Sequence, residues 1–194
     1  MTAAPNPSLD PTDEVLMDRY CAGDLVAFDT LFRRYVRRLV RFVTPYVGSG
    51  HAEDCAQQVF LKVHQARATF RAGARVAPWL FTIARHQALD HVRSAPRRRE
   101  HADGDVHASA VPVAPHLIDP SLDAAVRAAL SSLPADQRDV VTLHWLGGLT
   151  FPEVGVVVGA SHEAVRARAT RAYEGLRGQL GDLARELTLP GAPR

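Results

Sequence analysis

The stretch LTFPEVGVVVGASHEAVRARATRAYEGLR, residues Leu149–Arg177, decides how this chain is interpreted. Thr150 and Glu153 have the spacing of a capping box, in which each side chain accepts a hydrogen bond from the other residue's backbone N–H. Gly159 tolerates the left-handed backbone conformation that ends a helix, and Ser161 suits the start of the next one. The stretch therefore predicts a short helix, a tight turn and a longer helix, which together form a helix-turn-helix.

The second helix of this motif is predicted to have one buried stripe and one polar, cationic face. The apolar stripe consists of Val165, Ala169, Ala172, Leu176 and Leu180. The polar face carries the candidate DNA-binding residues His162, Glu163, Arg166, Arg168, Thr170 and Arg171. Arg166 and Arg171 are the best candidates for contacts to base edges or phosphates, because arginine presents a planar fork of donors. Glu163 could accept from a cytosine amine, but the helix dipole alone also favours an acidic residue in a first turn.

Composition indicates a folded protein and gives only weak support for a nucleic-acid partner. Hydrophobic residues make up 46% of the 194 residues, whereas the net charge is only +2. Lys62 is the only lysine among 23 basic residues, and biased codon usage is the favoured explanation for this arginine excess. The polar, acidic N-terminus and the lack of a long apolar run predict no signal peptide and no membrane insertion. We therefore expect a cytoplasmic protein with reduced thiols.

Apolar residues recur at helical spacing over most of the chain, and no strand pattern or internal repeat stands out. The fold class is predicted to be all-α, with two small helical domains joined by a flexible linker and a helix-turn-helix in the C-terminal one. The expected segments are a tail over 1–12, a domain over 13–95, a linker over 96–120, a domain over 121–181 and a tail over 182–194. The linker is rich in proline and has no apolar periodicity.

The first domain contains two groups of side chains with more than one interpretation. A basic run could be a solvated helix face or could follow a DNA backbone; it consists of Arg33, Arg34, Arg37, Arg38 and Arg41. The aromatic residues Tyr46, Trp79 and Phe81 could stack on unpaired bases. For Trp79, the helical register shared with Ile83 favours a place in the core.

The sequence predicts no metal site, no cofactor and no catalytic site. His51 and Cys55 lie four residues apart, but no second pair of ligands follows, and Cys55 falls on an apolar face. There is no nucleophile elbow and no glycine-rich phosphate loop, so the protein is not expected to be an enzyme. Two other hypotheses remain at this point: a stand-alone helix-turn-helix regulator, and a helical metal-dependent enzyme or metal sensor.

Five motifs occur in one order along the chain. They are CAGDLVAF from Cys21 to Phe28 with Leu31 and Tyr35; Ala52 to Asp54 with Gln57 and Phe60; WLFTIAR from Trp79 to Arg85 with Asp90 and Arg93; Leu133 and Pro134 with Arg138 and Leu143; and the helix-turn-helix. In this order, and nearly end to end, the chain resembles the extracytoplasmic-function (ECF) group of bacterial RNA polymerase sigma factors.

The resemblance implies a set of partners and a role for each domain. The N-terminal domain would bind the clamp helices of the largest subunit of core RNA polymerase through Asp54, Gln57 and Gln58. It would also melt the minus-ten promoter element and capture a flipped base, with Arg71, Arg75, His86, Asp90 and Arg93 as the DNA-binding residues. The C-terminal domain would bind the polymerase flap and recognise the minus-thirty-five element of promoter DNA through the polar face of the second helix of the helix-turn-helix. An anti-sigma factor is a further implied partner.

The chain departs from the family pattern at His86, Gly155, Pro152, Ala164, Ala169 and His64, and the first two departures bear most directly on function. The family usually has Asn where His86 stands and Ala where Gly155 stands. His86 implies an altered base preference at the minus-ten element. Gly155 lowers helix propensity by about 1 kcal/mol relative to alanine, which predicts a less stable helix-turn-helix.

Overall fold

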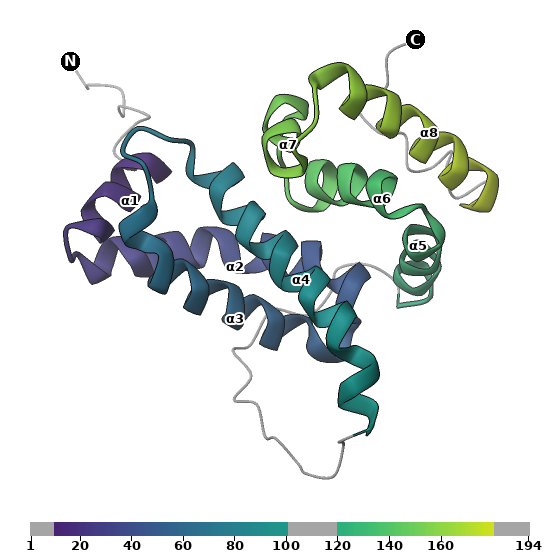
Figure 1. Ribbon diagram of the computed structural model, residues 1–194, viewed down its shortest axis with the longest axis horizontal. Helices are drawn as coiled ribbons and strands as arrows, with labels where there is room; N and C mark the ends of the chain where they lie inside the picture. The colour runs from purple at the N-terminus through teal and green to yellow at the C-terminus, as the bar shows by residue number, and fades with distance from the viewer. Residues whose placement is uncertain (1–9, 101–119, 181–194) are drawn as a thin grey trace, which may run out of the picture.

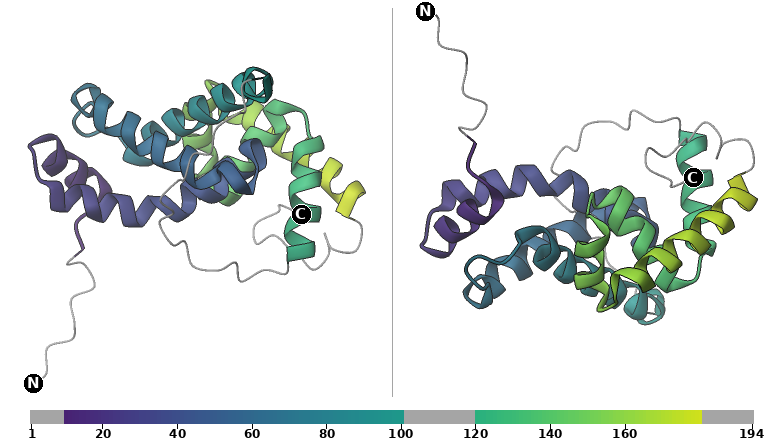
Figure 2. Two further views of the ribbon diagram at one scale, coloured as in Figure 1. Left: turned by 90° about the horizontal axis from the view of Figure 1, so that it is seen from below. Right: turned by 90° about the horizontal axis from the view of Figure 1, so that it is seen from above.

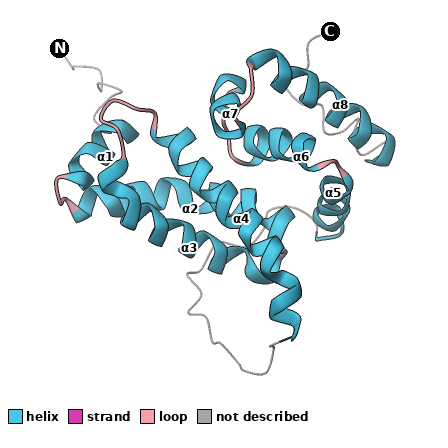
Figure 3. Cartoon of the chain, in the orientation of Figure 1, coloured by secondary structure: helices cyan, strands magenta, loops and turns pink. Residues whose placement is uncertain are grey.

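The computed structural model describes residues 10–100 and 120–180, and every regular element in these two ranges is helical (Figures 1 and 3). The N-terminal domain consists of α1 (Asp13–Cys21), α2 (Leu25–Val47), α3 (Ser49–Ala66), a 3-10 turn, η1 (Arg67–Thr69), and α4 (Val76–Glu100). The C-terminal domain consists of α5 (Pro120–Ser132), α6 (Ala135–Val141), a π-helical turn, η2 (Thr142–Leu146), α7 (Phe151–Val158) and α8 (His162–Leu180). The predicted all-α, two-domain fold is confirmed. None of the described helices has an apolar stretch long enough to cross a bilayer.

Helix α2 is the central element of the N-terminal domain, and its sequence explains where it begins and ends. The Asp24 carboxylate accepts hydrogen bonds from the backbone N–H groups of Val26 and Ala27 at 2.9 and 3.2 Å, which caps the helix. Gly48 then adopts a φ of 81°, which ends α2 and turns the chain into α3. An apolar stripe on α2 packs against α1, α3 and α4, with Leu31, Tyr35, Leu39, Phe42 and Val43 all buried.

Helix α4 extends further than the sequence periodicity indicated. It runs to Glu100, past residue 96, where the linker was expected to begin. Residues 101–119, which make up most of the predicted linker, lie outside the described residues.

The two domains pack against each other in this structure, an arrangement that the sequence did not predict. Helix α7 lies between α4 and α8 (Figures 1 and 2). One continuous cluster of buried apolar side chains includes Phe42 and Phe81 from the N-terminal domain and Leu143, Leu149 and Val154 from the C-terminal domain. The two domains therefore share one large core cluster, while a second, smaller cluster of Leu130, Leu133, Val141 and Ala172 lies within the C-terminal domain.

Polar contacts cross the same boundary. The Arg38 guanidinium donates from Nε to the Gly147 carbonyl oxygen at 2.9 Å. The Tyr46 hydroxyl donates to Asp139 Oδ1 at 2.6 Å, and the Arg85 guanidinium donates to Asp139 Oδ2 at 2.6 Å. The sequence analysis placed Arg85 in a motif but assigned it no contact, and it did not point to Asp139, because their pairing depends on the docking of two domains.

Gly155 proves to be a requirement of the turn that follows it, and not simply a weak point in α7. A Cβ at this position would lie 2.8 Å from the carbonyl oxygen of Ala160, which is closer than a carbon can approach. The Ala160 N–H in turn donates to the Gly155 carbonyl at 3.0 Å, so the turn lies directly against the helix. The low helix propensity of glycine is therefore offset by a tight helix-turn-helix.

We expect Gly155→Ala to lower the free energy of unfolding by about 1 kcal/mol, even though alanine favours helix formation. Forcing a methyl group into a packed site costs about 1–3 kcal/mol, which exceeds the gain in helix propensity of about 1 kcal/mol. Thermal unfolding followed by circular dichroism measures the change. Gly178→Ala is the matched control, because a Cβ at Gly178 in α8 meets nothing within 4 Å and should be neutral or stabilising. Equal stabilisation by both substitutions would contradict this explanation.

Candidate nucleic-acid interface

The helix-turn-helix forms as its sequence predicts. Thr150 Oγ1 accepts from the Glu153 N–H at 3.5 Å, while the Glu153 carboxylate accepts from the Thr150 N–H at 2.9 Å, which completes the capping box. Gly159 adopts a φ of 66° and ends α7. Ser161 Oγ accepts from the Ala164 N–H at 3.2 Å and caps α8.

Helix α8 has one buried face and one exposed face. Val165, Ala169 and Ala172 are buried against the rest of the domain. The exposed face carries five of the six residues predicted to bind DNA, namely His162, Glu163, Arg166, Thr170 and Arg171. Within the described residues, neither Arg166 nor Arg171 forms an ion pair. Both guanidinium groups are therefore available to an external anion such as a phosphate.

Arg168 differs from the other residues predicted on this face. Its Nε lies 3.3 Å from Asp136 Oδ2 of α6, and only 29% of its side chain is exposed. The ion pair ties α8 to α6. Arg168 therefore contributes to holding the domain together, a role that the sequence periodicity did not indicate.

The residues predicted to bind the minus-ten element fall into two groups. His86, Asp90 and Arg93 are exposed on α4, and Asp90 lies 3.8 Å from both Lys62 and Arg93. Arg71 and Arg75 lie in the exposed loop that precedes α4. Between α3 and α4 is an open cavity of about 450 Å³, lined by Lys62, Gln65, Ala66, Ile83 and His86. His86 therefore lines a cavity whose wall also contains the cationic side chain of Lys62 and the amide side chain of Gln65.

Arg75 already has two carboxylate partners. Its Nε lies 3.1 Å from Glu14 and its Nη2 lies 3.1 Å from Glu153, the capping residue of α7. The second of these ion pairs joins the loop before α4 to the helix-turn-helix. Arg71 has no such pair among the described residues.

The aromatic residues considered for base stacking lie mainly in the core. Phe81 is fully buried, with its ring 5.4 Å from that of Phe42. Tyr46 is held by its hydrogen bond to Asp139. Trp79 is partly buried and packs edge-to-face against Phe70, with ring centroids 5.1 Å apart. Phe81 therefore presents no face on which a base could stack, whereas Tyr46 is half-buried and has the Arg138 guanidinium over its ring, 5.2 Å from the centroid.

The arginine run on α2 is not a continuous basic stripe. Arg33 pairs with Asp29, Arg34 pairs with Asp13, and Arg38 contacts Gly147; only Arg37 and Arg41 are exposed without an ion pair in the described ranges. Three of the five guanidinium groups thus have partners within the protein, which disfavours the interpretation as a track for a DNA backbone.

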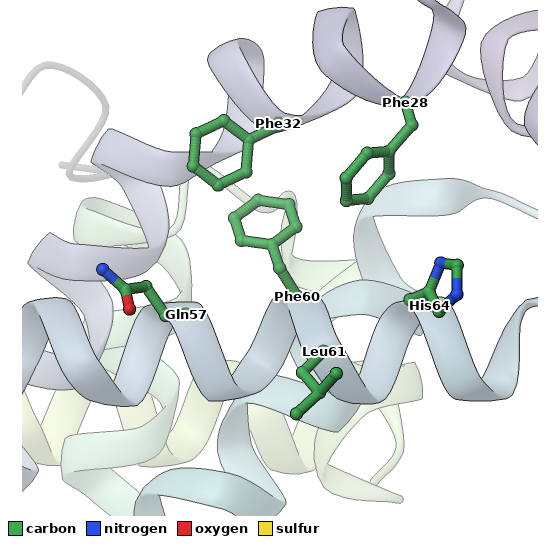
Figure 4. Close-up of a pocket in the computed structure, with 6 residues that line it drawn as sticks. All are labelled: Phe28, Phe32, Gln57, Phe60, Leu61 and His64. Carbon is green, nitrogen blue, oxygen red and sulfur yellow. The ribbon is translucent and has the colours of Figure 1, made fainter. Parts of the chain in front are cut away.

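The predicted polymerase-binding residues lie together on α3. Asp54, Gln57 and Gln58 are exposed. Beside them is an apolar hollow of about 310 Å³, lined by Phe28, Phe32, Gln57, Phe60, Leu61 and His64. Figure 4 shows Phe28 and Phe32 extending from α2 toward Phe60, with the remaining three side chains along α3. Exposed apolar surface with a polar rim is typical of a protein-binding site.

Cys55 is buried in the core, as its position on an apolar face indicated, whereas Cys21 is exposed and its Sγ donates to the Arg67 carbonyl at 3.3 Å. Among the residues that the structure describes, no three His, Cys, Asp or Glu side chains are grouped so that they could hold a metal ion.

Comparison with known proteins identifies the family. Residues 31–98 match Sigma-70 region 2 and residues 129–178 match Sigma-70 region 4. The RNA polymerase sigma factor CarQ of Myxococcus xanthus is 38% identical over 172 residues, covering 88% of this chain and 99% of CarQ. The ECF RNA polymerase sigma-E factor of Escherichia coli K12 is 30% identical over 185 residues, covering 90% of this chain and 97% of that protein. This chain belongs to the ECF sigma factors.

One solved structure agrees with this assignment, and a second shows the same fold. The sigma factor RpoE in complex with the anti-sigma factor NepR from Bartonella quintana is similar with a TM-score of 0.63 and 25% identity, over 79% of this chain and 96% of that one. CnrH in complex with the cytosolic domain of CnrY has a TM-score of 0.69 at 24% identity, over 87% of this chain and 96% of that one, and shows the same fold.

As an ECF sigma factor, the protein directs transcription initiation. The region 2 match contains the polar residues of α3 and the exposed positions of α4, and the region 4 match contains the helix-turn-helix. The hypothesis of a stand-alone regulator is therefore set aside, since it gave no role to the N-terminal domain.

Proposed function

We propose that this sigma factor binds core RNA polymerase through α3 and recognises a two-element promoter through α4 and α8. The observation that carries the proposal is the exposed face of α8. There, Arg166 and Arg171 lie beside a buried stripe that fixes the orientation of the helix. A helix held in this way by its partner helices suits insertion into a major groove.

The assignment to the minus-ten element rests on α4 and on the loop before it. His86, Asp90 and Arg93 share one exposed region of α4, and His86 lines the cavity beside α3. Arg71 and Arg75 add positive charge at the start of the helix. Melting costs a few kcal/mol for each unstacked base, and capture of a flipped base in a cavity offsets that cost.

Binding to polymerase and to DNA reinforce each other in this scheme. Each DNA-binding surface is small, and salt weakens its contacts to phosphate. When both surfaces are held on one polymerase, the second contact becomes intramolecular and gains from a high effective concentration. In this proposal the sigma factor recognises and melts the promoter, while the polymerase carries out the phosphodiester chemistry. The chain is therefore proposed not to be an enzyme. It is also proposed to act in the cytoplasm.

An anti-sigma factor is proposed as a further partner. The support is the similarity to RpoE, whose structure was solved with the anti-sigma factor NepR. The apolar hollow beside Gln57 offers a surface where such a protein would compete with polymerase.

We expect Asp54→Ala combined with Gln57→Ala to weaken binding to core RNA polymerase by about tenfold, because loss of a few interface contacts costs about 1–2 kcal/mol. Binding to core polymerase by fluorescence anisotropy tests this. A single-round transcription assay on a mapped promoter then shows whether initiation falls in parallel.

Glu174→Ala removes an exposed carboxylate on α8 and serves as the charge-matched control. If it weakens core binding as much as the α3 variant does, the assignment of polymerase binding to α3 is wrong. If the unaltered protein does not bind core polymerase at micromolar concentration, the proposed function itself fails.

A further inference from the structure

A buried carboxylate joins the two domains. Asp139 of α6 is only 2% exposed, and both of its side-chain oxygens are bound by groups of the N-terminal domain. Arg85 of α4 donates from Nε and Nη2 to Oδ2 at 2.6 Å, and Tyr46 of α2 donates to Oδ1 at 2.6 Å. Burial and the neighbouring Asp139 raise the pKa of Tyr46 well above its usual value, so its hydroxyl keeps the proton that it donates. Since a buried charge must be paired, this carboxylate favours the docked arrangement.

The backbone next to this carboxylate approaches the N-terminal domain closely. A Cβ at Gly147 would lie 3.0 Å from the Phe81 ring, and one at Gly148 would lie 3.3 Å from the Arg38 guanidinium. That guanidinium lies over the rings of Tyr35 and Phe81, 4.9 and 5.5 Å from their centroids, and donates to the Gly147 carbonyl. Gly147 is also required within its own turn, since its Cβ would lie 2.6 Å from the Leu143 carbonyl oxygen, and Gly148 adopts a φ of 67°; both residues lie directly against Phe81 and Arg38.

A third contact involves a residue proposed to bind DNA. Arg75 lies 3.1 Å from Glu153, which also caps α7. While this ion pair holds, the Arg75 guanidinium has a carboxylate where a phosphate would otherwise bind. Arg75 also pairs with Glu14 of its own domain and 70% of its side chain is exposed, so docking adds a second carboxylate partner without burying the guanidinium, and it leaves the exposed face of α8 uncovered.

In the docked arrangement the two DNA-binding helices lie too close together to reach both promoter elements at once. Helices α4 and α8 are separated only by α7, and packed helices lie about 8–10 Å apart, so the two DNA-binding helices are within roughly 20 Å. Elements centred near minus ten and minus thirty-five are about 25 base pairs apart, or roughly 85 Å of duplex at 3.4 Å per base pair. One molecule cannot contact both elements unless the domains separate.

We infer that the cluster of Asp139, Arg85 and Tyr46 is an autoinhibitory latch that holds the free sigma factor closed. The inference rests on the proposed two-element recognition. In the closed state the exposed α3 face still permits a first contact with polymerase, but engagement of both promoter elements requires the latch to open. The apparent affinity of the sigma factor for polymerase on promoter DNA is then the affinity of the open form multiplied by the fraction of molecules that are open.

Two substitutions in the full chain test the latch. Asp139→Asn removes the charge that Arg85 binds but keeps the side-chain volume, and Tyr46→Phe removes only one hydroxyl. Opening is measured by energy transfer between dyes on Cys21, which is exposed, and on Glu174→Cys in α8; Cys55 is buried and should remain unlabelled. We expect both substitutions to increase the population with low energy transfer, and Asp139→Asn to raise the apparent affinity of the polymerase–promoter assembly by about tenfold.

The control is Asp29→Asn, which neutralises an exposed carboxylate on α2 that pairs with the exposed Arg33, and it should leave both measurements unchanged. Circular dichroism tests whether each variant is folded. If Asp139→Asn does not fold, the energy transfer of Tyr46→Phe alone decides whether the latch exists. Energy transfer equal to that of the unaltered protein overturns the latch. Opening without a gain in affinity overturns its autoinhibitory role. If the unaltered protein fails to bind core polymerase, the proposed function fails, while energy transfer still decides whether the latch exists.

Discussion

Phe81→Ala is expected to lower the free energy of unfolding by about 3–5 kcal/mol, the usual cost of truncating a fully buried phenylalanine. Phe81 has no exposed surface and lies where the two domains meet. Its ring packs edge-to-face on Phe42 with centroids 5.4 Å apart and lies beneath the Arg38 guanidinium. Truncation would leave a cavity against Gly147 as well, so both domains should lose contacts.

Chemical denaturation followed by circular dichroism measures this change. Val92→Ala is the control on the same helix, because Val92 is 45% exposed and its truncation should change stability by less than about 0.5 kcal/mol. The energy-transfer assay on the same variant should also show partial opening at temperatures where the protein remains folded. A loss below about 1 kcal/mol would mean that Phe81 is not buried between the domains in solution.

The position of Phe81 shows what helical periodicity can and cannot predict. Helical register favoured a core position for Trp79 and left base stacking as the interpretation of Phe81 and Tyr46, whereas in the structure Phe81 is fully buried and Trp79 only partly. Helical periodicity could not show that α4 would be covered on a second side by α7. That covering depends on Gly147 and Gly148, which the sequence analysis did not connect with α2 or α4.

Features that depend on neighbouring residues were predicted well. The capping box of Thr150 and Glu153 and the left-handed Gly159 require only a few adjacent residues, and both occur in the structure. The pairing of Arg85 with Asp139 spans 54 residues and two domains. The ion pair of Arg168 with Asp136 of α6 is also a contact between residues distant in the sequence. The position of Arg168 on the helix resembles that of the DNA-facing residues, so its spacing alone did not reveal this partner.

The double substitution of Arg166→Ala and Arg171→Ala should abolish most minus-thirty-five recognition while leaving binding to core polymerase unchanged. Each arginine that contacts a base edge contributes about 1–3 kcal/mol, so the pair should reduce initiation from an intact two-element promoter by roughly 30-fold or more. Both side chains are exposed, so stability should change by less than about 0.5 kcal/mol. Single-round transcription and core binding, measured on the same preparations, separate the two activities.

The single variants distinguish a base contact from a phosphate contact. An arginine bound to a guanine edge should, when replaced, relax specificity at one position of the element. An arginine bound to phosphate should instead weaken binding to all sequences and reduce the salt slope by about one. Arg177→Ala is the control, since Arg177 is exposed near the end of the same helix but outside the proposed set. If Arg177→Ala lowers initiation as much as the double variant does, the total positive charge along α8 matters more than the position of each arginine. The proposal that Arg166 and Arg171 recognise the element is then wrong.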